Sequence, residues 1–397
     1  MDPAVPARSP LAPLRYHREV AAYLRDHERS VWDWAGSQVT DDRQRDALRA
    51  ALLRETYRLD PAAHADTHAL LATALQRLGI AAPATLYQSP GLEMNAALLY
   101  VPGEIHITLQ GPVLERLTPD ELLAVFGHEA AHYLLWSQLE HGALLADRIL
   151  GDSTAVADAH PSHVETWRRH ALHTELYADR GAALAANGVA PAITTLVKIQ
   201  TGIGSVDPDA YLRQAVEIEQ DEQGASQAHT HPETFLRARA LAKWWDGDAD
   251  LEDWLVRRLH GPLSLERLDL PGQSRLQEMT RKFVAHFLRD AGLATDAVLS
   301  HVRLMFPDWG ADEPAAGPES FGPDIVDDSV RAYLNALLLD LALADPDGRD
   351  AALLRAGGIA QALGSMDDLK LKLRRDAGFN KRELDAFQRK VAKEAQA

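Results

Sequence analysis

The stretch FGHEAAHYLL, residues 126–135, places two histidines four residues apart, with a glutamate directly after the first. On a helix, His128 and His132 would lie on one face and could direct imidazole nitrogens at a common point. Neutral imidazole is a good zinc ligand, and Glu129 would lie near a water bound to such an ion. Inside an apolar helix all three side chains would need polar partners, and a metal ion supplies them together. The spacing therefore predicts a zinc site.

A catalytic zinc ion needs a third protein ligand. The chain contains no cysteine, so this ligand must be His, Asp or Glu. A histidine six residues after the second would extend the motif, but Gln138 stands there. The stretch HTELYAD offers Glu175 and Asp179, again four residues apart. One of them can bind the metal while the other accepts a hydrogen bond from a ligand histidine.

The same acidic spacing is also common on solvated helix faces. The third ligand therefore has alternatives, all of them histidines near the motif or near Glu175. They are His141, His160, His163, His170 and His173.

A further polar group follows in the stretch HTHPETFLRARAL. Pro232 suits the first turn of a helix, so His231 just before it could reach into a cleft, with Arg237 nearly two turns on. A surface loop leading into an amphipathic helix would show the same pattern, because an isolated histidine is not diagnostic. Both interpretations remain open from these residues alone.

The elements that must position these residues are predicted to be mainly helical. Apolar spacings of three and four residues favour packing helices from about residue 11 to 80. Alternating patterns at residues 85–89 and 96–109, the second interrupted by a type II turn at Pro102 and Gly103, predict a small sheet. The fold class is therefore mainly α with a small β-sheet.

The helix that carries the first motif has a clear predicted start. Thr118 can cap it, Pro119 suits its first position, and Glu121 completes a capping box. The helix that carries Glu175 is predicted to end at Asn187 and Gly188. Further helices are predicted for DPDAYLRQAVEIEQ and PETFLRARALAKWW.

Composition suggests several domains, since 397 residues exceed one typical core. The stretch FPDWGADEPAAGPESFGPD, residues 306–324, has the composition of a linker. The expected parts are an N-terminal helical region, a catalytic domain, a helical extension with the linker, and a C-terminal helical module. Their predicted bounds are 1–82, 83–246, 247–322 and 323–397.

The formal net charge of −17 argues against a nucleic-acid partner, because such partners need a basic patch. The sequence shows no signal peptide and no apolar stretch of about 18 residues. We therefore expect no membrane insertion and a soluble, cytoplasmic protein.

Taken together, the motifs resemble the M48 family of zinc peptidases, which includes the Ste24 and HtpX proteases. The resemblance covers about residues 95–245 and consists of a strand, GHEAAH, the ELYAD helix followed by NGVAP, and THP with an arginine six residues after the histidine. It implies a zincin (gluzincin) fold that binds Zn²⁺ through three side chains. These ligands would be His128, His132 and Glu175.

The resemblance also implies roles for residues around the ligands. Glu129 would act as the general base, and Asp179 would accept a hydrogen bond from a ligand histidine. His231 and Arg237 would line the cleft and assist the transition state. Unlike the membrane-embedded relatives, the chain has no predicted spanning segment, so their substrates are not carried over.

Three functions are compatible with the sequence. The first is a soluble zinc endopeptidase that cleaves unfolded or flexible polypeptides, and the presence of the glutamate base favours it. The second is an adaptor or binding protein with a latent zinc site. The third is a helical interaction protein in which HEAAH arises by coincidence. The C-terminal region weakly resembles TerB-like helical modules, which suggests a site for a protein partner, although a plain helical bundle fits equally well.

Overall fold

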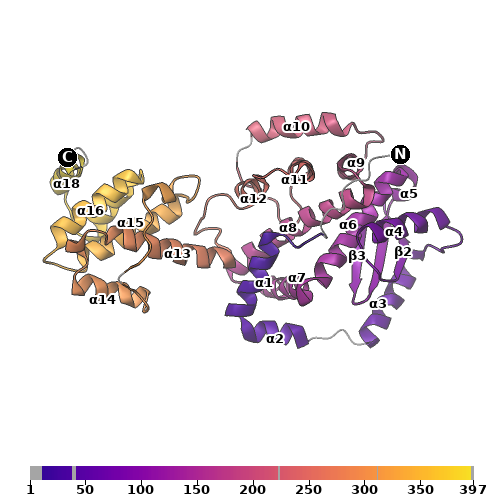
Figure 1. The fold of residues 1–397 in the computed structure, drawn as a ribbon, viewed down its shortest axis with the longest axis horizontal. Helices are drawn as coiled ribbons and strands as arrows, with labels where there is room; N and C mark the ends of the chain where they lie inside the picture. Colours follow the sequence, from indigo (N-terminus) through magenta and orange to yellow (C-terminus); the bar gives the residue numbers. More distant parts are fainter. Residues whose placement is uncertain (1–10, 38–41, 222–223, 311, 395–397) are drawn as a thin grey trace. The chain divides into compact units, whose positions relative to one another are not determined.

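The computed structural model describes residues 11–37, 42–221, 224–310 and 312–394. The chain divides into two compact units, Met1–His260 and Gly261–Ala397. The described residues are mostly helical and contain one small sheet, which confirms the predicted composition of the fold (Figure 1). No helix within these ranges has the length and apolar character needed to cross a bilayer.

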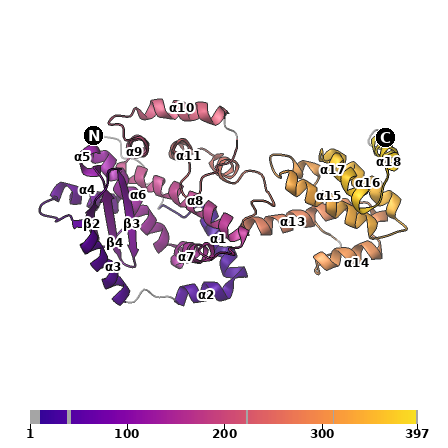
Figure 2. The same ribbon diagram turned by 180° about the vertical axis from the view of Figure 1, so that it is seen from behind.

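The sheet of the first unit has four strands in the order β1-β2-β4-β3. Their bounds are Tyr57–Arg58 (β1), Ala84–Ser89 (β2), Asn95–Val101 (β3) and Glu104–Gln110 (β4). Strand β2 runs parallel to β4, whereas β1 and β3 pair antiparallel with their neighbours (Figure 2). The sheet therefore extends beyond the predicted hairpin, and β3 forms one of its edges.

The turn between β3 and β4 has the predicted form. Val101 pairs with Glu104, so Pro102 and Gly103 make a two-residue connection. Gly103 has a φ of +82°, which suits the third position of a type II turn and which a side chain would disfavour. The predicted burial of Ile105, Ile107 and Leu109 in strand β4 is confirmed, but the alternation is incomplete because His106 is buried as well.

Helix α6 (Pro119–Ser137) carries the HEAAH motif and packs on this sheet. Its capping box forms as predicted: the Thr118 hydroxyl accepts from the Glu121 N–H at 3.4 Å, and the Glu121 carboxylate accepts from the Thr118 N–H at 2.8 Å. The Glu121 carboxylate also makes a buried ion pair with Lys198 at 2.8 Å. The start of the helix is thus held by local and by tertiary contacts.

Helix α8 (Pro161–Ala186) lies beside α6 and ends at Asn187, which has the left-handed φ of +56°. Two glycines allow the close approach of the two helices (Figure 1). A Cβ on Gly127 would lie 2.3 Å from the Cβ of Ala185, and one on Gly181 would lie 2.4 Å from the Cβ of Ala131. The separation of α6 and α8 is therefore set by residues without side chains.

We predict that Gly181→Ala destabilises the chain by about 1–3 kcal/mol, because overpacking outweighs the gain of about 1 kcal/mol in helix propensity. The measurement is the free energy of unfolding in urea. Gly151→Ala is the matched control, since Gly151 is also helical but a Cβ added there would have no atom within 4 Å. Equal stability of the two variants would contradict this explanation of the helix contact.

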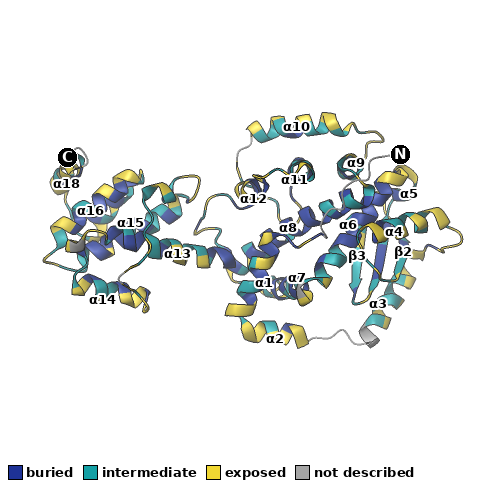
Figure 3. Cartoon of the chain, viewed as in Figure 1, coloured by how far each residue is buried: buried dark blue, intermediate teal, exposed yellow. Residues whose placement is uncertain are grey.

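The remaining helices of the first unit surround this pair. They are α1 (Arg15–His27), α2 (Arg29–Ser37), α3 (Asp42–Glu55), α4 (Ala65–Arg77), α5 (Val113–Arg116), η1 (Leu139–His141), α7 (Gly142–Thr154), α9 (Val189–Thr201), α10 (Pro208–Asp221), α11 (Thr234–Asp246), α12 (Leu251–Leu255) and η2 (Val256–His260). Figure 3 shows α6 and α8 largely buried and α10 largely exposed. The helices predicted around the two motifs and at α10 are confirmed, and α11 begins at Thr234 rather than at Pro232. The prediction of helices throughout residues 11–80 is wrong at Tyr57–Arg58, which form strand β1 because they pair with β2. Residues 38–41 of that stretch lie outside the described residues.

The second unit is helical. Its elements are α13 (Leu270–Phe287), η3 (Ala291–Leu293), α14 (Asp296–Met305), η4 (Pro318–Phe321), α15 (Asp328–Leu343), α16 (Arg349–Ala362), α17 (Met366–Asp376) and α18 (Lys381–Glu394). The stretch 306–324, whose composition predicted a linker, instead packs inside this unit. Phe306 and Phe321 are buried in the same core as Phe283, and this apolar burial outweighs the Pro- and Gly-rich composition.

Candidate metal centre

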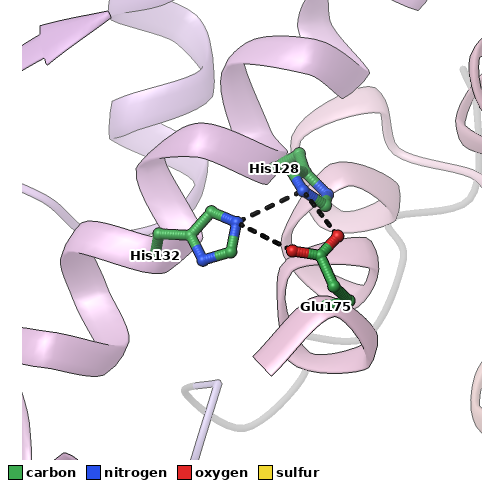
Figure 4. A group of neighbouring side chains, drawn as sticks. All are labelled: His128, His132 and Glu175. Carbon is green, nitrogen blue, oxygen red and sulfur yellow. Dashed lines mark hydrogen bonds and ion pairs between the residues drawn. The ribbon is translucent and has the colours of Figure 1, made fainter. Parts of the chain in front are cut away.

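His128 and His132 lie one turn apart on α6, and their rings point toward the carboxylate of Glu175 on α8 (Figure 4). The Nε2 atoms of the two histidines lie 3.3 Å apart. Oxygens of Glu175 lie 3.5 Å from His128 Nε2 and 3.8 Å from His132 Nε2. The structure therefore brings together the three residues that the sequence analysis expected to bind zinc.

The chemistry and spacing of this group fit a zinc ion. One nitrogen or oxygen atom from each residue lies within 4.8 Å of the others. Ligand atoms at about 2.0–2.1 Å from a tetrahedral zinc ion are about 3.4 Å from one another. The separations in this group, 3.3, 3.5 and 3.8 Å, are close to that value. Two imidazoles and a carboxylate are a known donor set for catalytic zinc.

Asp179 lies one turn beyond Glu175 on α8 and sets the orientation of the first histidine. Its Oδ1 atom lies 3.3 Å from His128 Nδ1. A proton on Nδ1 would be donated to this carboxylate, which leaves the lone pair of Nε2 directed at the group of ligand atoms. The geometry is the one expected for a carboxylate that supports a ligand histidine.

Arg237 of α11 is held by both carboxylates of α8. It donates from Nε and Nη2 to the two oxygens of Asp179, at 2.8 and 2.6 Å, and Nη2 lies 3.1 Å from Glu175. Arg237 lines the cleft, which is the position that the resemblance implied. Its guanidinium, however, is bound to Asp179 in a planar, two-point contact that no local pattern indicated.

The charges of the site stabilise positive charge on His128 but not on His132. Burial would raise the pKa of Glu175, but Arg237 and His128 together hold this pKa well below its usual range. Burial would likewise lower the pKa of His128, but hydrogen bonds to Asp179 and Glu175 raise it to about 10. The pKa of His132 falls to about 4 because the ring is buried.

Glu129, the predicted general base, is buried beside the candidate ligands with 6% of its surface exposed. Burial raises the pKa of its carboxyl, while the positive charge of His128 and a hydrogen bond from the backbone N–H of Leu98 oppose that change. Leu98 belongs to the edge strand β3. The carboxyl group therefore lies between the ligand helix and the edge of the sheet.

His231 lies on the loop before α11, with 63% of its side chain exposed. Its Nε2 atom is 3.6 Å from an oxygen of Glu175, and its Nδ1 atom is 2.9 Å from the hydroxyl of Thr230. We call His128, His132 and Glu175 the metal group. The structure brings His231 to the rim of this group, as the resemblance implied.

All of these residues line one cleft of about 420 Å³. Its walls come from α6, α8, α9, the edge strand β3 and the loop of His231, with one residue each from α7 and α11. Asp147, Trp136 and Trp167 also line the cleft and were not predicted as site residues. Trp136 lies four residues after His132 on α6, and Trp167 lies eight residues before Glu175 on α8. Residues at these spacings lie near one another on a helix surface, so helical periodicity could have indicated both tryptophans.

The histidines considered as alternative third ligands do not join the metal group in the described part of the chain. Two of them lie on a different face of α8: His173 Nε2 is 2.9 Å from His260 Nε2, and His170 packs edge-on against His17. The others contact neighbouring groups. These contacts are His141 with the carbonyl of Trp136, His160 with the N–H of Ser162, and His163 with the carboxylate of Glu28.

A cleft lined by a His-His-Glu group and a neighbouring glutamate defines a candidate metallohydrolase site. The chain is similar to the plastoglobule-localized metallopeptidase 48 of Arabidopsis thaliana, a chloroplastic protein, with 29% identity over 202 residues. The match covers 45% of this chain and 56% of the relative, so the chain spans about half the length of the curated protein it matches. No family model and no solved structure matches the chain.

This similarity supports a distant relationship to M48-type metallopeptidases. It agrees with the family that the sequence motifs resemble.

Proposed function

We propose that this chain is a zinc-dependent endopeptidase of the M48 type, with a zincin (gluzincin) fold and its catalytic residues within residues 83–246. Its substrates are peptide bonds in unfolded or flexible polypeptides. The observation that carries the proposal is the three-residue donor group of His128, His132 and Glu175 beside the buried Glu129, all lining one cleft. The distant metallopeptidase relative supports the same class of reaction.

In the proposed mechanism, His128, His132 and Glu175 hold the metal. A zinc ion bound there supplies Lewis acidity, which makes a water nucleophilic near neutral pH and polarises the peptide carbonyl. Glu129 accepts the proton of the attacking water and returns it to the nitrogen of the leaving amine. Asp179 and Arg237 act through the ligands, because they orient His128 and Glu175 rather than reaching the substrate.

The edge of the sheet offers a means of aligning the substrate. Strand β3 is an edge strand, and Asn95, Ala96, Ala97 and Leu98 line the cleft. An extended peptide that pairs with this edge would form backbone hydrogen bonds with β3. The scissile bond would then lie between Leu98 and the metal group, next to Glu129.

His231 is proposed to stabilise the oxygen on which negative charge develops. We predict that His231→Phe lowers kcat by up to about 10²-fold and leaves the metal content unchanged, because an exposed donor contributes less than a buried one. The exposed residue His229 of the same loop offers a control in His229→Phe. A His231→Phe enzyme with native kcat and a changed KM would show that the loop binds substrate instead.

The function is tested by removing and restoring the metal. Purified chain should contain about one zinc ion per molecule, and it should cleave a casein-like unfolded protein. A strong chelator should abolish cleavage, and one equivalent of zinc should restore it. Undiminished cleavage after complete metal removal would contradict the proposal.

An alternative is an adaptor or binding protein with a latent peptidase site, whose C-terminal helical module binds a protein partner. A zinc-loaded chain that cleaves no unfolded polypeptide would favour it. Absence of bound zinc would instead favour a helical interaction protein. A cytoplasmic location remains a prediction from the absence of a signal peptide or spanning stretch in the sequence. The absence of a nucleic-acid partner remains a prediction from the net charge of −17.

A further inference from the structure

The cleft has two ends that differ in chemistry, because α6 and α8 run in opposite directions along it. His128 lies near Asp179, and His132 near Glu175, so rising residue numbers on α6 face falling numbers on α8. Beyond His132, the wall therefore continues with Trp136 of α6 and with the earlier residues of α8. At the opposite end, the lining is mostly apolar, with Thr195 as its polar member among Ala124, Val125, Ala182, Ala192, Leu196 and Ile199.

The end beyond His132 carries two tryptophans and a carboxyl group. Trp136 lies one turn after His132, and Trp167 lies two turns before Glu175. Asp147 of α7 lines the same cleft. Among the described lining residues, the other acidic ones are Glu175 of the metal group, the proposed base Glu129, and Asp179, which contacts His128 and Arg237.

Asp147 is not neutralised by the histidine nearest to it. His170 Nδ1 lies 4.0 Å from Asp147 Oδ1, which is beyond hydrogen-bonding distance. Burial lowers the pKa of His170 to about 4, so this ring is neutral at physiological pH. The side chain of Asp147 remains 41% exposed, and it can therefore be reached by a ligand in the cleft.

Burial also raises the pKa of Asp147 to about 6, and the neighbouring Arg148 opposes this change only in part. A carboxylate that is partly removed from water gains more from a cation than a fully solvated one does. Tryptophan rings offer the best aromatic faces for a cation. The guanidinium of Arg237 and the ring of His231, which also line the cleft, are close to Glu175 at the metal group.

We propose that Asp147, with Trp136 and Trp167, forms a subsite that selects polypeptide substrates with a lysine or arginine side chain near the scissile bond. This inference rests on the proposed peptidase function and names the class of segment that the cleft prefers. The formal net charge of −17 also favours the approach of cationic segments.

The helix geometry gives the distance from this subsite to the reaction. His170 and Trp167 precede Glu175 by five and eight residues, which corresponds to about 7.5 and 12 Å along α8. An extended peptide advances about 3.3 Å per residue. The basic side chain is therefore expected two to four residues from the scissile bond.

The test measures peptide binding separately from hydrolysis. It uses the zinc-loaded Glu129→Gln chain, so that bound peptide is not consumed, and labelled peptides followed by fluorescence anisotropy. Paired peptides differ at a single position, lysine in one and the uncharged norleucine in the other, and that position is moved along the peptide. The lysine peptide should bind about tenfold more tightly at the favoured position.

Asp147→Asn added to this chain should remove the tenfold preference and leave binding of the norleucine peptide unchanged. Asp147→Lys should reverse the preference in favour of a peptide with glutamate at that position. Asp152→Asn is the control, because Asp152 is exposed on the same helix and does not line the cleft. Both Asp147 variants should keep the native circular dichroism spectrum.

The subsite would be overturned by equal affinity for the lysine and norleucine peptides, or by no binding of either peptide. It would also be overturned if Asp147→Asn weakened the binding of both peptides equally. Failure of the proposed function has a different signature. In that case, the zinc-loaded native chain would not hydrolyse peptides, whether or not they bind with a preference for lysine.

Discussion

Zinc-loaded Glu129→Gln should keep its metal and its fold and hydrolyse unfolded polypeptides at least about 10²-fold more slowly than the native chain. Glutamine has nearly the same size as glutamate and can still accept the backbone N–H of Leu98, so the buried position is preserved. It cannot accept the proton of the attacking water. The loss should therefore appear in kcat rather than in zinc content or stability.

This result is checked by steady-state hydrolysis of a casein-like protein, with zinc measured in the same samples. Glu217→Gln, at an exposed position of α10, is the matched control and should retain native activity. Native turnover in zinc-loaded Glu129→Gln would exclude Glu129 as the base. Loss of zinc in this variant would show that the carboxylate supports the metal site instead.

Glu175→Ala should weaken zinc binding by more than about 10²-fold, since even residues that only support a metal ligand typically contribute 10- to 100-fold. The replacement removes the only carboxylate of the donor group, and Arg237 then retains Asp179 as its acidic partner. His128 and His132 alone leave two open positions in a tetrahedral site. Zinc should consequently be lost to a moderate chelator that the native chain resists.

The measurement is competition with a chromophoric chelator, and Glu217→Ala is the control. Asp179→Asn should give a smaller effect, within the 10- to 100-fold range, because Asp179 acts through His128. Full retention of zinc in Glu175→Ala would place the third ligand elsewhere. Equal losses in Glu175→Ala and Asp179→Asn would contradict their different roles.

Several features of the site were determined by the sequence alone, because they depend on neighbours within one or two helical turns. The capping box of Thr118 and Glu121, the stop at Asn187 and the common face of His128 and His132 are all of this kind. The turn at Gly103 is equally local. Their geometry follows from backbone preferences and helical periodicity, which do not depend on distant parts of the chain.

The pairing of elements was decided only by the tertiary structure. Strand β2 pairs in parallel with β4, and α6 meets α8 across Gly127 and Gly181. The residues around each glycine do not show whether it allows close packing of two helices or ends its own helix. The contact depends on side-chain volumes from both helices at once, and these are brought together by folding.

The environment of the metal group likewise depends on distant segments. Arg237 reaches Asp179 across 58 positions of the chain, and Asp147 enters the cleft from α7, between the two ligand helices in sequence. The sequence determined the residue types that can bind a metal and the helices that carry them. The tertiary structure decided which charges face one another, because electrostatic partners are set by distance in space and by burial rather than by separation along the chain.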